Sequence, residues 1–270
     1  MTDKASDLKR RYDAFALTGD ENTTASDFHL RELEIDLALR HIRDGDRVLD
    51  VGCGPGVALR RYATERSIDG FGIDYSENMV DFARKRTAEA APGVAIDFRV
   101  ASVDDLPFDD TAFDVVTNHR CLMALLDWQR QQKAILEIHR VLKPGGTFVM
   151  MEGTFDGLER LNRYRRKFDL PEIAAGGDDR LPTLKFHERE LTAYCEPYFE
   201  LVHTQRFGMY YFLTRIVQPL LVAPERPRYD HPLNAVARKI ARHVPDFGGI
   251  GHLVGFVWRK RPTAAAPARH

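Results

Sequence analysis

The chain has 270 residues, of which 44% are apolar and 29% charged, so it can form the core of one α/β domain with insertions and is not disordered as a whole. Its 39 basic and 40 acidic residues nearly cancel, and this balance disfavours nucleic acid as a partner. The polar first residues and the lack of an apolar run long enough to span a bilayer predict a cytoplasmic protein, and membrane contact is not expected.

The first predicted element is a helix over residues 27–42. Leu30, Leu33, Leu37 and Ile42 recur there at helical spacing, with charged residues between them. We expect this helix to pack with its apolar face on the first strand of a sheet.

From residue 47 onwards, short apolar runs alternate with helix-length amphipathic segments. This alternation predicts a parallel sheet with right-handed crossovers. Ser76 occupies the N-cap position of one helix, and the tetrapeptide of residues 143–146, KPGG, predicts a turn after another. The predicted strands are residues 47–51, 70–73, 95–100, 113–117 and 147–151, and the predicted helices are residues 57–66, 76–90 and 128–142.

After residue 151 the pattern changes to insertions. Residues 158–167 are basic, a loop with Gly176 and Gly177 follows, and residues 187–194 are predicted to be helical. Residues 199–207 and 252–259 are predicted as two strands that complete the sheet, separated by a long aromatic excursion. An insertion of this length between strands is typical of a lid or a specificity pocket.

Two segments of the insertions allow more than one interpretation of their role. The basic run is interpreted as a solvated helix face, with recognition of a carboxylate or phosphate on a ligand as the alternative; it comprises Arg160, Arg163, Arg165, Arg166 and Lys167. The apolar stretch is predicted to pack in the core or a lid and not on a membrane; it comprises Phe207, Tyr210, Tyr211, Phe212, Ile216, Leu220 and Leu221.

A glycine-rich loop follows the first predicted strand. Residues 50–56 read DVGCGPG, and glycines let the backbone turn sharply and approach a ligand closely. The spacing is G-x-G-x-G and differs from the G-x-G-x-x-G of dinucleotide binders. Asp50 at the end of the strand would repel a pyrophosphate and attract a cationic ligand. The loop therefore favours a positively charged ligand at the carboxyl edge of the sheet.

A second carboxylate, Asp74, ends the next predicted strand, 24 positions after Asp50. A carboxylate at this place in such folds accepts both hydroxyls of an unphosphorylated ribose. Tyr75, Ser76 and Met79 follow it, and residues 101–108 follow the third strand, so these segments are expected to surround an adenine.

Taken together, four motifs resemble those of the class I S-adenosylmethionine-dependent methyltransferases. They are residues 48–56, residues 72–74 (GID), residues 104–108 with 113–116, and residues 137–146 (EIHRVLKPGG). The resemblance covers about residues 46–152. It implies an α/β, Rossmann-like seven-stranded, mostly parallel sheet with helices on both faces, an antiparallel last strand, and insertions that form a cap.

The resemblance also implies a domain organisation and a cofactor. Residues 1–45 would form a helical segment covering the cofactor site, residues 46–262 the methyltransferase domain with insertions at about 154–187 and 208–250, and residues 263–270 a frayed tail. The implied cofactor is S-adenosyl-L-methionine, with the glycines against its methionine part, Asp50 near its ammonium and Asp74 on its ribose. The expected cofactor-binding residues are Asp50, Gly52, Cys53, Gly54, Gly56, Asp74, Tyr75, Met79, Ser102, Val103 and Asn118.

The chain departs from the family at Ser102, because the family usually has an acid there that accepts from the adenine amino group. A hydroxyl accepts this bond more weakly, and Asp104 is the alternative acceptor. The three cysteines, Cys53, Cys121 and Cys195, have no metal-ligand spacing, so they are expected to be small buried or loop residues and no metal site is predicted.

The expected activity is transfer of a methyl group to a small acceptor, with O-methylation of a hydroxylated metabolite or sugar preferred. The alternatives are N-methylation of a small amine, a lipid-like acceptor, or a cofactor-binding protein without catalysis; a nucleotide-dependent oxidoreductase is disfavoured by the glycine spacing. His119 is the expected general base, with packing or capping as its alternative role. The expected acceptor pocket contains Arg120, Glu152, His187, Tyr210 and Tyr211, and the protein is expected to be a monomer or homodimer.

Overall fold

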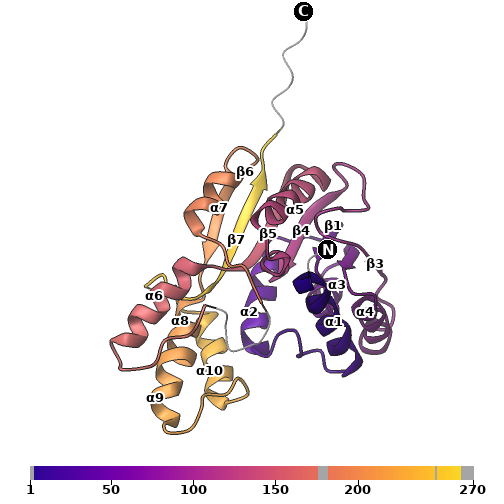
Figure 1. Cartoon of the computed structure of the whole chain (residues 1–270). Coiled ribbons are helices and arrows are strands. Elements are labelled where there is room, and N and C mark those ends of the chain that lie inside the picture. Colours follow the sequence, from indigo (N-terminus) through magenta and orange to yellow (C-terminus); the bar gives the residue numbers. More distant parts are fainter. Residues whose placement is uncertain (1–2, 176–181, 247, 263–270) are drawn as a thin grey trace, which may run out of the picture.

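The computed structural model describes residues 3–175, 182–246 and 248–262, so the predicted Gly176–Gly177 loop and the predicted frayed tail lie outside the described residues. Seven strands form one twisted sheet in the order β3-β2-β1-β4-β5-β7-β6 (Figure 1). All neighbouring strands are parallel except β7, which is antiparallel to both β5 and β6. The predicted sheet and its antiparallel last strand are confirmed. The strands are β1 Arg47–Val51, β2 Asp69–Asp74, β3 Ile96–Val100, β4 Phe113–His119, β5 Leu142–Gly153, β6 Phe199–Gln205 and β7 Leu253–Lys260.

The central strands are covered on both faces. β1 is almost completely buried, as expected for a parallel strand with helices on either side, and two hydrophobic clusters lie against the sheet. The register aligns Val51 of β1 with Ile73 of β2 and with Asn118 of β4. This alignment brings the ends of β1, β2 and β4 together at one edge of the sheet.

One predicted turn is instead part of a strand. The KPGG tetrapeptide lies at the start of β5, which begins at Leu142. The pairing of β5 with β4 shifts register between Phe113 and Val115, and Gly145 has a φ of +75°. The chain therefore turns within an irregular beginning of the strand, where a bulge accommodates the extra residues.

The helices begin where capping side chains predict them. Ser76 accepts a hydrogen bond from the Met79 amide at the start of α4, as expected, and Asp27, Asp127 and Thr154 cap α2, α5 and α6 in the same way. Among the described residues, none of the helices is both long and apolar enough to cross a bilayer. The helices are α1 Asp3–Leu17, α2 Phe28–Leu39, α3 Val57–Glu65, α4 Glu77–Ala90, α5 Trp128–Val141, α6 Phe155–Arg166, α7 Glu188–Cys195, α8 Gly208–Phe212, α9 Gln218–Val222 and α10 Pro232–Ala241, with the short turns η1 Leu122–Leu125 and η2 Leu213–Val217.

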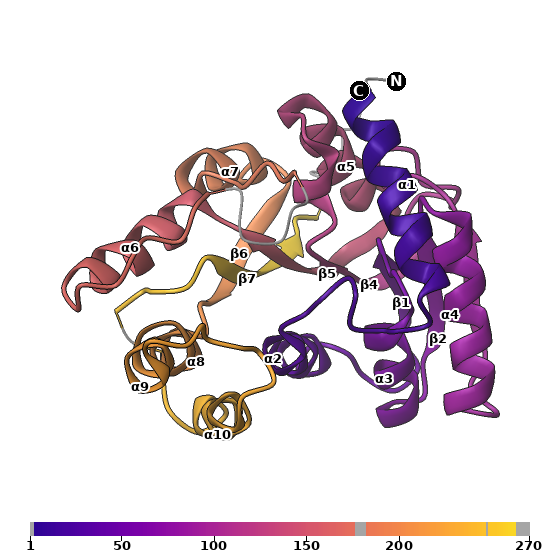
Figure 2. The same cartoon turned by 60° about the horizontal axis from the view of Figure 1, so that its bottom comes forward.

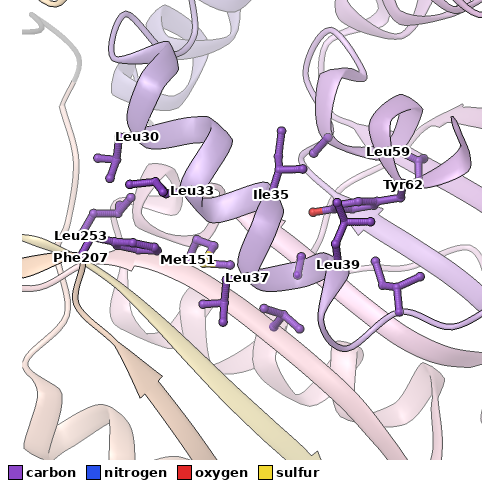
Figure 3. Packing of buried hydrophobic residues seen from close by; sticks show 14 of the residues in the cluster. Leu30, Leu33, Ile35, Leu37, Leu39, Leu59, Tyr62, Met151, Phe207 and Leu253 are labelled. Atoms are coloured by element: carbon purple, nitrogen blue, oxygen red, sulfur yellow. The ribbon is translucent and has the colours of Figure 1, made fainter. Parts of the chain in front are cut away.

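Helix α2 is buried on more than the one face that its sequence predicts. Leu30 and Leu33 lie towards Phe207 and Leu253, Leu37 lies towards Met151, and Ile35 and Leu39 lie towards Leu59 and Tyr62 (Figure 3). The second insertion, with α8 and α10, covers the side of α2 that the sequence leaves to solvent (Figure 2). Glu34 shares the face of Leu30 and Leu33 in the helical repeat and is fully buried although it is charged, because it lies against His119 and Arg120 at the end of β4.

The second insertion packs into the core, as predicted for its aromatic residues. Phe207, Tyr210, Tyr211 and Ile216 are buried, whereas Leu220 and Leu221 of α9 are exposed. Figure 1 shows α8, α9 and α10 as a group beside α2 and α6.

The interpretation of the basic run on α6 as a solvated face is wrong for two of its residues. Arg165 is buried and its Nε donates to the Pro171 carbonyl at 2.8 Å. Arg160 is half-buried and donates to the Gly249 carbonyl at 2.7 Å and to Glu188 at 2.5 Å. These arginines tie α6 to neighbouring loops, and only Arg163, Arg166 and Lys167 are exposed.

Substitution of Gly157 is expected to destabilise the fold, because this residue lets α6 approach the loop before β7. A Cβ at Gly157 would lie 2.1 Å from the Gly251 carbonyl oxygen and 2.8 Å from Thr154 Oγ1. Gly157→Ala must therefore move backbone, and we expect a loss of about 3 kcal/mol of unfolding free energy in urea denaturation, as in overpacked cores. Glu159→Ala, an exposed change on the same helix, should cost less than about 0.5 kcal/mol. An equal effect of the two variants would contradict the close approach.

Candidate active site

A cavity of about 1300 Å³ opens at the carboxyl edge of the sheet. Its walls come from α1, the loop before α2, the glycine loop, the ends of β2 and β4, and both insertions. Pockets for one small ligand usually measure roughly 300–1000 Å³. The cavity is therefore large enough for two small ligands side by side.

The glycine loop has a backbone that only glycine adopts easily. Gly52, Gly54 and Gly56 have φ angles of +69°, +49° and +73°, all in the left-handed region. A Cβ at Gly52 would lie 2.5 Å from Cys121 Sγ, whereas one at Gly54 would meet nothing closer than Thr24 Oγ1 at 3.9 Å. The loop thus exposes bare backbone at Gly54 to the cavity and packs tightly on Cys121 at Gly52.

Two carboxylates stand on either side of this loop. Asp74 accepts hydrogen bonds from the amides of Gly54 and Ser76, both at 2.9 Å, so it links the end of β2 to the loop. Asp50 is buried and accepts from Thr117 Oγ1 at 2.8 Å. Burial raises the pKa of Asp74 to about 6, against the opposing effect of the two amide hydrogen bonds, and burial also raises the pKa of Asp50.

The segment after β3 forms the next part of the wall. Ser102 and Val103 line the cavity, as does Tyr75 after β2. The Ser102 hydroxyl donates to Asp104, whose other carboxylate oxygen accepts from Arg130 Nε at 2.8 Å. Burial would raise the pKa of Asp104, but the hydrogen bonds from Arg130 and Ser102 lower it. An ionised carboxylate therefore stands beside the position where the family usually has its acid.

The end of β4 brings together His119, Arg120 and a residue that the sequence did not suggest, Glu34. His119 Nε2 lies 2.8 Å from the Tyr62 hydroxyl, and His119 Nδ1 lies 3.3 Å from Glu34 Oε2. Arg120 donates to the same Glu34 oxygen at 3.2 Å. Burial would raise the pKa of Glu34, but the charge of Arg120 and the hydrogen bond with His119 lower it. His119 and Arg120 line the cavity, so a buried carboxylate orients both from behind.

Arg120 also has an unusual backbone, with a φ of +61° although it has a side chain. Its amide donates to the Met151 carbonyl at 2.8 Å, which fixes this conformation at the end of β4. Residues that hold a left-handed φ without being glycine cluster at functional sites. The backbone thus supports a functional role for Arg120.

Several predicted site residues do not line the cavity. Gly56 packs beneath the loop, where a Cβ would lie 2.9 Å from the Phe98 ring, and Met79 is a buried residue in the first turn of α4. Asn118 is buried and donates to Glu152 Oε1 at 2.5 Å. The carboxylate of Glu152 also accepts from the amides of Leu122 and Met123, so both residues support the wall from below.

Three predicted acceptor-pocket residues also lie elsewhere. The Tyr210 hydroxyl donates to the N-cap residue Asp27, and the Tyr211 hydroxyl accepts from the Leu253 amide at 3.2 Å. Both rings are fully buried behind the wall. His187 is exposed at the start of α7, where its ring stacks on Phe155 with centroids 4.8 Å apart. Packing and hydrogen bonds within the fold therefore account for these side chains.

Other cavity residues come from parts of the chain whose sequence gave no signal. Tyr12 of α1 is one; burial and the negative charge of Asp74 raise the pKa of its hydroxyl. Arg31 of α2, Lys185 of the first insertion, and Arg215 and Tyr229 of the second also line the cavity. No local motif marks them, because only the packing of distant segments brings them to the edge of the sheet.

The fold and the comparisons with known proteins show what this chain is similar to. Its strand order, with an antiparallel strand between the last two parallel positions, is that of the Rossmann-like class I methyltransferases. Residues 48–146 match the family model described as "Methyltransferase domain", which confirms the resemblance found in the sequence.

Two curated relatives and one solved structure illustrate the similarity. The chain is 37% identical over 120 residues to demethylmenaquinone methyltransferase of Symbiobacterium thermophilum, a match that covers 44% of this chain and 47% of that protein. It is 33% identical over 132 residues to 27-O-demethylrifamycin SV methyltransferase of Amycolatopsis mediterranei, a match that covers 48% of this chain and 47% of that protein. The chain thus spans about half the length of these relatives.

The structural match extends further along the chain. A putative methyltransferase of Haloferax volcanii, solved in complex with the Trm112 methyltransferase activator, has a TM-score of 0.64 and 21% identity. The match covers 96% of this chain and 99% of the other. The likeness therefore includes the insertions and supports the fold as a whole.

Proposed function

We propose that this protein is an S-adenosylmethionine-dependent methyltransferase that acts on a small acceptor. The observation that carries the proposal is the pairing of two features in one cavity: a glycine loop with three left-handed glycines after β1, and Asp74 at the end of β2. The match of residues 48–146 to a methyltransferase domain supports it.

The residues around the loop fit the cofactor by shape and by charge. The bare backbone at Gly54 leaves room for the methionine part, and Asp50 would hold its ammonium group. Asp74 would accept the two ribose hydroxyls, and Asp104, with Ser102 beside it, would accept from the adenine amino group. Two buried or half-buried carboxylates, Asp50 and Asp74, suit a ligand that carries positive charge.

The chain's own task is alignment and exclusion of water. When bound, S-adenosylmethionine supplies a methyl group that its sulfonium has already activated. Holding two reactants in line supplies roughly 7–11 kcal/mol in favourable intramolecular models. Tyr12 of α1 and the insertion residues Lys185 and Arg215 wall the cavity on the sides that the sheet leaves open.

O-methylation of a hydroxylated metabolite or sugar is the form of the reaction that we propose. The walls from α1 and the insertions flank a cavity of a size that suits a small molecule beside the cofactor, and the relatives named above include an enzyme named for a 27-O-demethyl substrate. His119 would accept the hydroxyl proton; its Nδ1 is oriented by Glu34, and its Nε2 would have to exchange Tyr62 for the acceptor.

Calorimetry separates this proposal from its rivals. We expect S-adenosylhomocysteine to bind the purified protein and NAD(H) not to bind, whereas the reverse result would indicate an oxidoreductase. With S-adenosylmethionine and a panel of small hydroxylated and amino acceptors, release of S-adenosylhomocysteine should depend on a hydroxylated acceptor. Binding without any release across the panel would indicate a protein that retains the fold but not the activity.

Replacing the expected base tests the role of His119. We expect His119→Ala to lower kcat by about 100-fold, within the range for general bases, and to leave S-adenosylhomocysteine affinity within twofold. His187→Ala, at an exposed histidine outside the cavity, is the matched control and should leave both values unchanged. Steady-state kinetics and calorimetry give the two readouts, and an unchanged kcat in His119→Ala would remove this residue from the reaction.

A further inference from the structure

Charge is divided unevenly within the cavity. The carboxylates Asp50 and Asp74 lie beside the glycine loop, whereas the wall built from α2, the end of β4 and the insertions carries four basic side chains. These are Arg31, Arg120, Lys185 and Arg215. The negative charge beside the glycine loop suits a cationic cofactor, and the positive charge of the other wall suits an anionic ligand.

Arg215 and Arg120 each form an ion pair with a buried carboxylate. Arg215 pairs with Asp27, the N-cap residue of α2. Arg120 pairs with Glu34 at 3.2 Å, but Glu34 also holds His119, so one carboxylate serves two groups. Glu34 is therefore shared between two side chains of this wall, Arg120 and His119.

Arg31 is the basic side chain of this wall with a buried donor that has no hydrogen-bond partner among the described residues. It donates to the Glu21 carbonyl at 2.9 Å and to Asn22 Oδ1 at 2.8 Å, both neutral acceptors. Its Nε is buried and has no hydrogen-bond partner. Among residues 3–175, 182–246 and 248–262, no carboxylate lies within salt-bridge distance of its guanidinium. The carboxylates of Glu34, Glu32 and Glu21 act on this charge from farther away, so a carboxylate bound in the cavity would be the acidic group in direct contact with it.

Burial and the positive charge of this wall lower the pKa of Arg31 and of a nearby histidine. Burial and the charge of Arg120 lower the pKa of Arg31. Burial and the charges of Arg215 and Lys185 lower the pKa of His252, which also lines the cavity, to about 3. His252 therefore stays neutral at physiological pH and adds no further positive charge to the wall.

We infer that Arg31 and Arg120 bind a carboxylate of the methyl acceptor, which makes the acceptor a hydroxylated organic acid with an apolar body. The inference rests on the proposed function. A guanidinium offers two parallel donors that match the two oxygens of a carboxylate. Phe15, Leu30 and Tyr229 line the same cavity and provide apolar contacts for the rest of the molecule.

Matched ligands test the inference directly. The protein is first saturated with S-adenosylhomocysteine and then titrated by calorimetry with acid and amide pairs: benzoate and benzamide, 3,4-dihydroxybenzoate and its amide, and 1-naphthoate and its amide. An amide keeps the shape of the acid and removes its charge. We expect at least one acid to bind at least tenfold more tightly than its amide. Equal binding within each pair, or no acid binding up to 10 mM, would overturn the inference.

Variants assign the preference to the two arginines. Arg31→Met should reduce the acid-to-amide ratio at least fivefold, while Arg40→Met, an exposed change beyond the other end of α2, should leave it unchanged. Arg120→Met leaves Glu34 buried beside one partner fewer, so Arg120→Met with Glu34→Gln is made as well. A ratio that survives in Arg31→Met and in the double variant would overturn the assignment.

The titration with S-adenosylhomocysteine distinguishes failure of the proposed function from failure of the carboxylate site. If S-adenosylhomocysteine does not bind, the proposed function fails. If it binds and the acids show no preference over the amides, the proposed function stands and the carboxylate site is wrong. Inorganic phosphate is titrated in parallel, and tighter binding of phosphate than of every acid would also overturn the carboxylate assignment.

Discussion

Asp74→Ala is expected to weaken binding of S-adenosylhomocysteine by about 100-fold. The substitution removes two hydrogen bonds from ribose hydroxyls to a charged acceptor, each worth about 1.5–3 kcal/mol, and roughly 3 kcal/mol in total corresponds to this change in affinity. Part of the loss is indirect, since Asp74 also accepts from the amides of Gly54 and Ser76 and so holds the glycine loop to β2.

Calorimetry with three variants distinguishes these contributions. Asp74→Asn keeps one acceptor oxygen and should lose less affinity than Asp74→Ala. Asp69→Ala removes a carboxylate at the opposite, exposed end of the same strand and should not change the affinity. We would abandon the ribose assignment if Asp74→Ala bound within twofold of the unmodified protein.

Glu152→Gln is expected to remove a large part of the pH dependence of stability. Glu152 is fully buried, and burial raises its pKa to about 8, although hydrogen bonds from Leu122, Met123 and Asn118 act in the opposite direction. An unfolded glutamate has a pKa near 4.5. Between these two values the unfolded chain has lost the proton while the folded chain still holds it, so protonation stabilises the fold and the stabilisation is lost as pH rises.

The expected slope for this one group is up to about 1.4 kcal/mol per pH unit, or about 3 kcal/mol between roughly pH 5.5 and pH 7.5. Glutamine does not titrate, so the free energy of unfolding of Glu152→Gln should rise relative to that of the unmodified protein over this range. Urea denaturation at several pH values measures it. Glu190→Gln, at an exposed site on α7, should keep the original slope, and a parallel pH profile for Glu152→Gln would contradict the expected titration.

Local patterns in the sequence predict the sheet well. Short apolar runs mark β1 and β4, because both strands are covered on two faces, and Ser76 marks the start of α4 through a hydrogen bond of its own side chain. The same reasoning fails at Glu34. It lies on the same face of α2 as Leu30, Leu33 and Leu37, where the repeat predicts an apolar residue, and its charge is accommodated by His119 and Arg120, more than 80 residues later in the chain.

The residues of the candidate site also differ in how well the sequence predicts them. Asp50, Asp74 and the glycines lie in a loop and at strand ends whose positions follow from local order, so motif spacing brings them together correctly. Tyr210 and Tyr211 resemble pocket residues by type, yet their hydroxyls bond Asp27 and the Leu253 amide behind the wall. Residue type alone does not distinguish a ring that faces a cavity from one that supports it.

The position of α2 between the cavity and the second insertion bears on how the acceptor of such a protein could change. It carries both Arg31 and Glu34, and the second insertion packs over its outer side (Figure 2). If both segments contact the acceptor as proposed, exchange of the insertion alone between two such proteins would change one side of the pocket and leave α2 unchanged beside it. A change of acceptor would then involve two segments, α2 and the second insertion, and strands β1 to β6 lie between them in the chain.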